Sequence, residues 1–430
     1  MDANTTLCLK SELDLFSTTP IQLAVESSSF LEIHPVASLN DKNPLEFSSF
    51  GMGDTYLDLA HTILHLQVKI TKNTDANLIG TDVVAPVNYF LNSMFSECSV
   101  FLNDKQVSSQ VNYAYRAIFE SLLFYSKSAQ DTMLSSALFS KDTAEKHENV
   151  SSPFTNKGFE NRKDLCKESK LMDLIGPLHF DLATQPKLLI NGINFRIKLE
   201  KNKDAFSLMS ATNNFKIKIV DAKLYVRKVV VSPSIMLAHE KALEHGVIKL
   251  PVKRVEVKTF TLSQGISSTT IPNAFIGQMS TRLIMSFVSN DAYSGTIDKN
   301  PFNFKNNNLI YMCVLNAGQM YPSKPYQPDF KNDCYARSYL SLFTDLGRYH
   351  NFQNININYE EFKGGYSFWV IDLSADFASN ENHASVTKSG NLSIDMKFGE
   401  NLTETQNLLV YATYDNVIEI DKSRTVFTDY

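Results

Sequence analysis

Hydrophobic and polar residues alternate along much of this chain. Between Ile63 and Ile70 most apolar residues stand at every second position, which predicts a strand with one buried face and one face in water. A hairpin is predicted at 100–107, where the turn dipeptide Asn103-Asp104 separates two apolar runs. Further strands are predicted at 176–183, 187–202, 214–232, 247–262, 282–289, 308–316, 366–374, 392–398 and 407–421. Short strands at this spacing indicate antiparallel sandwiches or barrels rather than βαβ units.

A helical period replaces the alternation in a few segments. Between Asn112 and Ser126 the apolar residues recur at three- and four-residue steps, which predicts an amphipathic helix. A second helix is predicted after Pro233 and is expected to stop at Gly246. The expected buried stripe of this second helix is Ile235, Leu237, Ala238, Ala242 and Leu243. Some helical character is also expected at 335–347.

These elements divide the chain into two β halves joined by one helix. The predicted limits are an N-terminal arm at 1–44, a first β domain at 45–232, a linker helix at 233–246 and a second β domain at 247–430. Within the arm, a short helix is considered at 11–16. The polar stretch 127–170 is expected to be a long surface insertion.

Composition supports a soluble folded protein of about two domains. The chain has 430 residues, of which 43% are hydrophobic and 20% charged, and its net charge is −5. The lack of a basic excess argues against a nucleic-acid groove, and the basic alternation from Lys249 to Lys258 is better interpreted as a solvated strand face. No apolar run reaches the ~18 residues needed for a membrane span, and the N-terminus does not resemble a secretory signal. The five cysteines form no CxxC pair, which favours free thiols in a reducing compartment.

One stretch, "LAHEKALEHG" from Leu237 to Gly246, nearly matches a zinc-protease helix motif. That motif requires a second histidine four residues after the first, so that both face one metal. Here Leu243 holds that position, and His245 stands six residues after His239, roughly 120° further round the helix. A plain connecting helix is therefore predicted rather than a metal site.

Other candidate chemistry is equally weak. Gly51 and Gly53 lack the following Lys-Ser/Thr pair of a phosphate loop and are expected to be turn glycines. His61 and His65 would lie ~13 Å apart on one strand face, too far apart to share a metal. Cys98 is expected to be a buried structural thiol. The sequence thus predicts no catalytic, cofactor-binding or metal-binding residues, no cofactor and no enzyme activity.

Three segments carry a resemblance to a known family. "NYFLNSMFSECSVFLNDKQVSSQVNYAYRAIFESLLFYS" (88–126) resembles the part of the Polinton/Maverick and adintovirus-like major capsid proteins that runs from an apolar helix-like stretch through a hairpin into an aromatic helix. "LYVRKVVVSPSIMLAHEKAL" (224–243) and "IKLPVKRVEVKTFTLSQG" (248–265) are similar to the connection between the two halves of those proteins. The resemblance covers residues 45–430 and rests on patterns rather than on catalytic residues.

The resemblance implies an all-β fold of two tandem eight-stranded antiparallel jelly rolls, with short helices in insertions and a linker helix. It also implies a major capsid protein that forms homotrimers, which act as pseudo-hexameric capsomers in an icosahedral virion shell. Its partners would be neighbouring capsomers and penton and minor capsid proteins, with no specific nucleic-acid site and no membrane span. The protein would be made inside the host cell and not secreted.

The alternatives are a β-sandwich protein that binds carbohydrate or a receptor, a minor capsid or penton component, and a hydrolase on a β scaffold. Length disfavours a single jelly roll. Trp369 is expected to be buried, which disfavours an exposed aromatic platform. The aromatic loops 300–308 and 320–330 either make contacts between subunits or fold back over their own sandwich.

Overall fold

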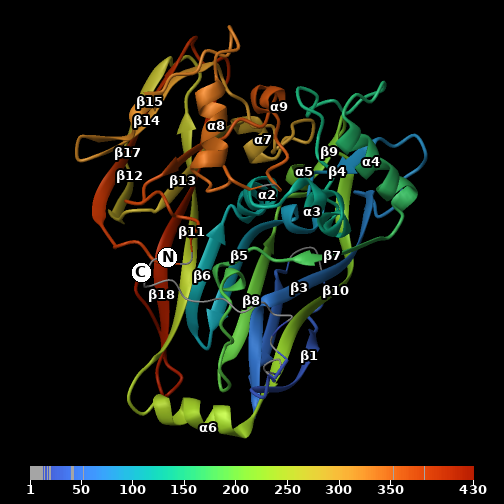
Figure 1. Cartoon of the computed structure of the whole chain (residues 1–430). Helices are drawn as coiled ribbons and strands as arrows, with labels where there is room; N and C mark the ends of the chain where they lie inside the picture. Colours follow the sequence, from blue (N-terminus) through green and yellow to red (C-terminus); the bar gives the residue numbers. More distant parts are fainter. Residues whose placement is uncertain are drawn as a thin grey trace.

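The computed structural model describes residues 21–39, 43–51, 53–351, 353–381 and 383–430, together with residues 13, 15, 16 and 18. Two β-sandwiches follow one another along the chain and stand side by side (Figure 1). Helix α6 (Pro233–Ala242) crosses from one to the other at one end, which is the lower end in Figure 1. Much of the short 11–16 segment, where a helix was considered, lies outside the described residues.

Each sandwich is built from eight principal strands in two antiparallel sheets of four. The strands of the first are β1 (Val25–Ile33), β2 (Leu45–Phe50), β3 (Thr55–Lys72), β5 (Phe95–Leu102), β6 (Lys105–Val111), β7 (Met172–Pro177), β8 (Asn194–Lys201) and β10 (Phe215–Val231). Those of the second are β11 (Ile248–Leu262), β12 (Ser268–Gln278), β13 (Arg282–Ser289), β14 (Leu309–Asn316), β15 (Gln319–Tyr326), β16 (Trp369–Asp372), β17 (Ser389–Phe398) and β18 (Gln406–Ile420). The short β4 (Val84–Pro86) pairs with β9 (Leu208–Ser210), and β19 (Val426–Thr428) extends the sheet at β18.

The two sandwiches have the same topology. In the first, the sheets are ordered β1-β10-β3-β7 and β2-β8-β5-β6, and in the second β11-β18-β13-β16 and β12-β17-β14-β15. Numbered along the chain within each half, both therefore follow the orders 1-8-3-6 and 2-7-4-5. This is the jelly-roll arrangement of interlocked Greek keys, so the predicted fold of two tandem eight-stranded jelly rolls is confirmed.

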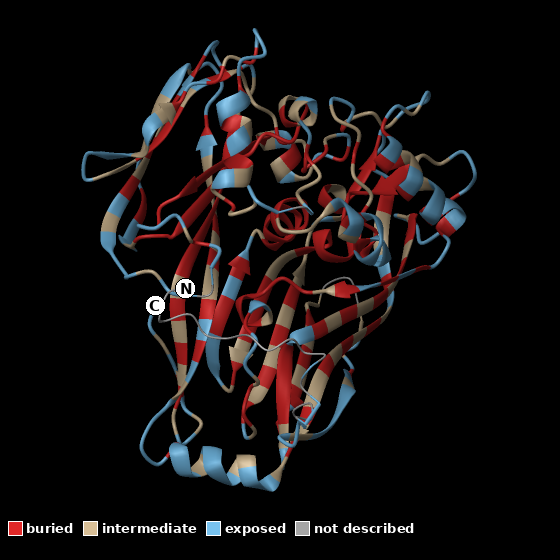
Figure 2. Ribbon diagram, viewed as in Figure 1, coloured by how far each residue is buried: buried red, intermediate tan, exposed pale blue. Residues whose placement is uncertain are grey.

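Alternating burial explains why these segments form strands. On β3, Leu64, Leu66, Val68 and Ile70 are fully buried, and they alternate with less buried partners. Figure 2 shows the same alternation of buried and exposed stripes along the lower strands of both sandwiches. The hairpin predicted around Asn103 is present as β5 and β6.

Helices occupy the loops at the other end and the region between the sandwiches. They are α1 (Phe90–Ser93), α2 (Tyr113–Leu123), α3 (Lys127–Asp131), α4 (Lys157–Cys166), α5 (Asp204–Ser207), α7 (Asn290–Ser294), α8 (Ala336–Thr344) and α9 (Tyr359–Lys363). The helices expected at 112–126 and 335–347 are thus present as α2 and α8. An amphipathic pattern alone suggests a helix with one face in water. Every residue of α2 is buried, however, so this helix lies in the interior (Figure 2).

The structure corrects the predicted start of the first sandwich. Strand β1 lies within the range assigned to the arm, yet it pairs with β10 from Val25 to Ile33. The burial of β1 is weak, with most of its residues exposed. Because β1 is an edge strand that buries little, it lacks the apolar alternation that marks the inner strands.

Two edge strands were also missed in the second sandwich. Strand β12 contains Pro272, and β15 contains Pro322 and Pro325, so these segments were interpreted as loops. Proline removes a backbone donor and is tolerated only where one side of a strand has no partner. Both strands are the outer members of their sheet, which is why proline fits there.

Two further predictions were wrong in detail. The strand expected at 176–183 ends at Pro177, and Asp181–Thr184 forms a 3₁₀ turn whose Asp181 points inward. The predicted buried stripe of the linker helix is also absent, because α6 has no buried residue and Leu237 is 71% exposed. Only Leu243, just beyond the end of the helix, is buried. The helix spans a gap between two sandwiches and has no sheet face packed along it.

Candidate functional site

The two sandwiches meet where the edge strand β11 of the second faces the edge strand β6 of the first. Gln110 donates from Nε2 to the carbonyl of Val255 at 2.7 Å, and Asn112 donates from Nδ2 to the carbonyl of Val257 at 3.2 Å. The Asp181 carboxylate accepts from the backbone nitrogen of Val255 at 3.2 Å. Side chains of the first sandwich thus form hydrogen bonds with backbone carbonyl and amide groups of β11. In a free edge strand these groups would be available for pairing with a strand of another molecule.

Behind this contact, a buried ion-pair network fixes α2 between the sandwiches. Arg116 on α2 is fully buried, and it donates to Asp181 Oδ1 at 2.7 Å and to Glu120 Oε1 at 2.8 Å. Asp181 also accepts from Ser108 Oγ on β6 at 3.0 Å. A buried guanidinium is tolerated only when it is paired in this way, so the network holds α2, β6 and the 181–184 turn in one geometry.

The same network reaches the second sandwich through Glu120. Its carboxylate accepts from Tyr411 of β18 at 2.9 Å and is bonded to Nδ1 of His179 at 2.6 Å. Burial alone raises the pKa of Glu120, but the charge of Arg116 and the hydrogen bond from His179 outweigh it and lower the pKa to about 2. The carboxylate is therefore ionised at neutral pH and links both halves of the chain.

Acid is expected to weaken this junction. A carboxyl group whose pKa is lower in the folded protein contributes stability above its unfolded pKa and loses it as pH falls toward the folded value. For Glu120 that window runs from its ordinary value of 4.5 down to about 2. We expect Glu120→Gln to be less stable than wild type at pH 7 and to lose less stability across this window, measured as the urea midpoint at each pH. The exposed Glu26→Gln should keep the wild-type acid dependence, and equal slopes for E120Q and wild type would contradict this assignment.

A second buried cluster connects the 127–170 segment to loops of the second sandwich. Asp142 is bonded to Arg162 Nη2 at 2.6 Å and accepts from Asn300 Nδ2 at 3.0 Å. Tyr366 donates to the backbone carbonyl of Asp142 at 2.7 Å. Asp142, Arg162 and Asn300 are buried. The prediction that the 127–170 segment is a surface insertion is therefore wrong in part, because some of its side chains are buried in contacts between the two halves.

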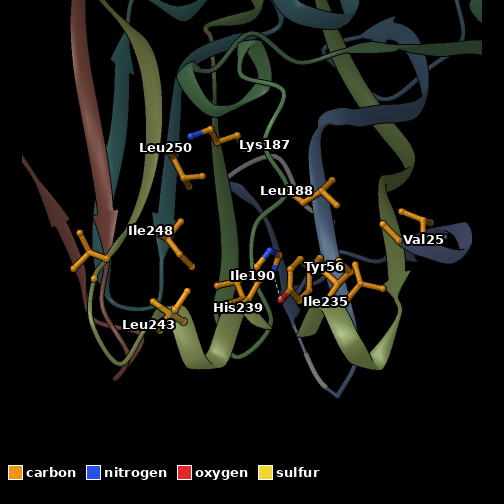
Figure 3. Close-up of a pocket in the computed structure, with 15 residues that line it drawn as sticks. Val25, Tyr56, Lys187, Leu188, Ile190, Ile235, His239, Leu243, Ile248 and Leu250 are labelled. Atoms are coloured by element: carbon orange, nitrogen blue, oxygen red, sulfur yellow. Dashed lines mark hydrogen bonds between the residues drawn. The ribbon is translucent and has the colours of Figure 1, made fainter. Parts of the chain in front are cut away.

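At the opposite end, α6 covers an apolar cavity of about 450 Å³ between the sandwiches (Figure 3). Leu188 and Ile190 from the first half and Ile248 and Leu250 from the second line it. His239 on α6 is bonded through Nδ1 to the hydroxyl of Tyr56 at 2.9 Å. This contact anchors the otherwise exposed helix to β3, so the helix is a structural connection.

The histidines singled out in the sequence do not converge. His245 is exposed and lies beyond the last residue of α6, whereas His239 contacts Tyr56. His61 is bonded to Asp58 at 2.8 Å and His65 to Asp173 at 2.7 Å. Within the residues that the structure describes, no cluster of three or more His, Cys, Asp or Glu side chains could hold a metal ion.

The remaining candidates have structural surroundings. Cys98 is buried as predicted, and burial raises its pKa to about 12, so the thiol stays protonated at neutral pH. Gly53 lies in a turn with a φ of 66° directly before β3. Lys253 of β11 pairs with Asp415 of the neighbouring β18 at 2.6 Å, whereas Lys258 pairs with Glu256 on β11 itself. None of the described helices is long and apolar enough to cross a membrane.

Several aromatic side chains of the two aromatic loops are buried within the chain. Phe302 and Phe304 of the 300–308 loop are buried, as are Tyr326 and Phe330 of the 320–330 loop. Trp369 is fully buried, as predicted. Phe302 packs against Tyr115 and Phe206 of the first half, and Phe304 packs against Phe119 of α2, so the 300–308 loop also joins the two sandwiches.

Sequence reasoning missed Arg116, Glu120, Asp181 and His179. They are separated along the chain, and each lies in a segment whose local pattern has another explanation. A useful signal was present, because Arg116 and Glu120 stand four residues apart among the apolar residues of one predicted helix. A charged pair with this spacing inside an apolar segment predicts a buried ion pair.

Comparison with known sequences gives one extended match. No family model matches the chain. An uncharacterized protein of Caenorhabditis elegans is 27% identical over 425 residues, which is 95% of this chain and 98% of that protein. The two chains therefore correspond over nearly their whole length, including both sandwiches and the connecting helix.

Comparison with solved structures shows the fold. A chain of the Sputnik virophage structure matches with a TM-score of 0.66 and 13% identity, covering 99% of this chain and 93% of that one. The Faustovirus major capsid protein matches with a TM-score of 0.60 and 9% identity over 96% and 92% of the two chains. The mavirus major capsid protein matches with a TM-score of 0.52 and 13% identity over 100% and 96%. Because these matches span nearly both chains in each pair, the tandem arrangement of two jelly rolls is shared as a whole.

Proposed function

We propose that this protein is a major capsid protein whose homotrimers form the pseudo-hexameric capsomers of an icosahedral shell. The observation that carries the proposal is the repetition of one jelly-roll topology, 1-8-3-6 and 2-7-4-5, in both halves of a single chain. If each sandwich is called a lobe, three chains supply six similar lobes around one axis. A capsomer with near-sixfold shape can occupy a hexagonal position in a shell although it contains only three copies.

The junction supports this role because shell building requires the two lobes to keep a fixed orientation. The buried contacts of Arg116, Glu120 and Asp181 on one level and of Asp142 and Arg162 on another connect the two halves. The edge strands β12 and β15 contain prolines, which disfavour pairing with a strand of another copy, so we expect copies to meet through side chains and loops. The chain offers the rigid building block that repeated packing in a shell demands.

A finer assignment rests on the sequence resemblance alone. We propose that the chain belongs with the Polinton/Maverick-like capsid proteins, which residues 45–430 resemble in pattern. In this proposal the protein is made in the host cell and ends in the virion shell. Its partners are neighbouring capsomers and the penton and minor capsid proteins that complete the shell.

Size-exclusion chromatography with light scattering tests the proposal directly. We expect a stable species with three times the mass of the chain, and negative-stain images of it should show pseudo-hexagonal particles. A monomer at micromolar concentration would instead favour the carbohydrate-binding or receptor-binding alternative and contradict the capsomer.

The loop between β16 and β17 offers a sharper test of assembly. Its Phe377 and Val386 are 72% and 85% exposed, respectively. Covering such apolar surface with a partner removes it from water and so contributes favourable free energy to association. We expect the double variant Phe377→Ser and Val386→Ser to shift the light-scattering mass toward the monomer without lowering the unfolding temperature of the monomer. Exposed Leu237 on α6 provides the matched control, and Leu237→Ser should leave the trimer intact. Unchanged trimer in the double variant would exclude this loop as an interface.

A further inference from the structure

Between the two sandwiches, beside the buried network, lies a cavity of about 410 Å³ lined mainly by polar and charged residues. Residues of α2 form one wall of the cavity, and residues of β13 and β18 of the second sandwich form another. The cationic side chains that line it are Arg116, Lys253, Arg282 and Arg348, and the acidic one is Glu120. Arg116 is paired with Glu120 and Asp181, and Lys253 is paired with Asp415, so Arg282 and Arg348 are the cations that give the cavity its positive charge.

Within the described ranges, Arg282 forms no direct ion pair with a carboxylate. Its side chain is buried, with 7% of the residue exposed, and its guanidinium lies 5.1 Å from the centre of the Phe124 ring. Among the described residues no carboxylate forms an ion pair with it, and its Nε has no hydrogen-bond acceptor. Buried charges are normally paired, and an unsatisfied buried donor usually marks a bound water or ion.

The nearby carboxylates cannot serve Arg282, because other groups occupy them. Asp372, its neighbour across the β13–β16 pairing, accepts hydrogen bonds from the hydroxyls of Ser374 at 2.6 Å and Ser379 at 2.7 Å. Glu120 is occupied by Arg116, His179 and Tyr411. Arg282 therefore has no direct ion-pair partner in the described part of the chain, and the charges of Asp372 and Glu120 offset its burial only in part.

A second arginine adds to the excess. Arg348 donates to the carbonyl of Phe124 at 2.7 Å and forms no ion pair with any residue in the described part of the chain. Burial lowers the pKa of Arg282 and so does the charge of Arg348, which means that the two guanidinium groups repel each other. Arg116 and Thr413 also line this cavity, and their buried Nη2 and Oγ1 atoms lack hydrogen-bond partners within the described ranges.

We propose that this cavity binds a phosphate-class oxyanion, either inorganic phosphate or the phosphate group of a small phosphorylated molecule. Arg282 and Arg348 supply its charge neutralisation, while Thr413 and Arg116 supply further donors. Guanidinium groups match the geometry of phosphate oxygens and form charge-assisted hydrogen bonds with them. Because the lining residues come from both sandwiches, the bound anion joins the two lobes and stabilises their relative orientation.

Calorimetric titration of the full-length protein with inorganic phosphate, at constant ionic strength in chloride, tests the site. We expect saturable binding and a matching rise in unfolding temperature, since a ligand that binds only the folded state stabilises it. Glycerol phosphate in a parallel titration distinguishes the two sources, because tighter binding of the ester assigns the site to phosphorylated molecules. Tighter binding of inorganic phosphate assigns it to the free ion.

Arg282→Met removes the guanidinium and keeps an aliphatic stem over Phe124. We expect its Kd for phosphate to rise by at least ~10-fold while its unfolding temperature without phosphate stays equal to or above that of wild type, because an unpaired buried charge is lost. Arg348→Met, at a more exposed position, should weaken binding in the same direction, and Lys218→Met on the exposed face of β10 should leave binding unchanged. Absence of phosphate binding to wild type, or wild-type affinity in both arginine variants, would overturn the proposal.

Discussion

Asp181→Ala is expected to lower the free energy of unfolding by about 3–5 kcal/mol, the loss typical of removing one partner from a buried ion pair. Asp181 is 1% exposed and contacts Arg116 at 2.7 Å and the backbone nitrogen of Val255 at 3.2 Å. Its removal leaves the buried guanidinium with Glu120 as its remaining carboxylate partner and frees a backbone donor of β11. The free energy is measured by urea unfolding at a fixed protein concentration.

Because Asp181 connects both sandwiches, its loss should also reduce cooperativity. We expect the unfolding curve of D181A to broaden or to separate into two transitions, one for each sandwich. Asp181→Asn keeps an oxygen acceptor, so we expect its free energy of unfolding to fall by less than that of D181A. The exposed pair of Lys127 and Asp131, at 2.6 Å, provides the matched control, since Asp131→Ala should cost less than ~1 kcal/mol. Similar losses for D181A and D131A would show that the junction is not held by this pair.

Phe119→Ala is expected to cost a similar amount, about 3–5 kcal/mol, through the cavity that it leaves. Phe119 belongs to α2, which follows β6 of the first sandwich, but its ring is surrounded by residues of the second. The ring centres of Phe304 and Phe368 lie 5.3 and 5.1 Å away, and that of Tyr411 lies 6.3 Å away. The helix thus contributes a core residue to the second sandwich, and its truncation should destabilise both halves.

Thermal and urea unfolding of Phe119→Leu and Phe50→Ala complete this test. Leucine fills most of the space, so the loss in F119L should be clearly smaller than in F119A. Phe50 is 68% exposed at the end of β2, and its truncation should change stability by no more than ~0.5 kcal/mol. If F119A were as mild as F50A, α2 would not be a shared core element.

The sequence by itself determined the inner strands. On β3 and β8 every second residue is apolar, and the structure buries those residues: Leu64, Leu66 and Val68 on β3, and Phe195 and Ile197 on β8. Burial of alternate side chains is a local consequence of the two-residue period of a strand, so it can be predicted without knowing which strand is the neighbour. The 112–126 helix was predictable from its helical period, the linker helix from Pro233 and Gly246 at its ends, and the hairpin from the turn residues Asn103-Asp104.

The tertiary structure decided what lies at the edges and between the sandwiches. Strands β1, β12 and β15 bury little or contain proline, so only their pairing partners define them as strands. Arg116, Glu120 and Asp181 meet only after α2 has been inserted between two sheets that are distant in sequence. Apart from the four-residue spacing of Arg116 and Glu120, the local sequence gives no signal that these charged residues are buried, because the cost of burying them is offset by partners that the chain brings together over long separations. For that reason the strands of each lobe can be recognised from sequence, whereas the contacts that fix the two lobes into one body required the folded structure.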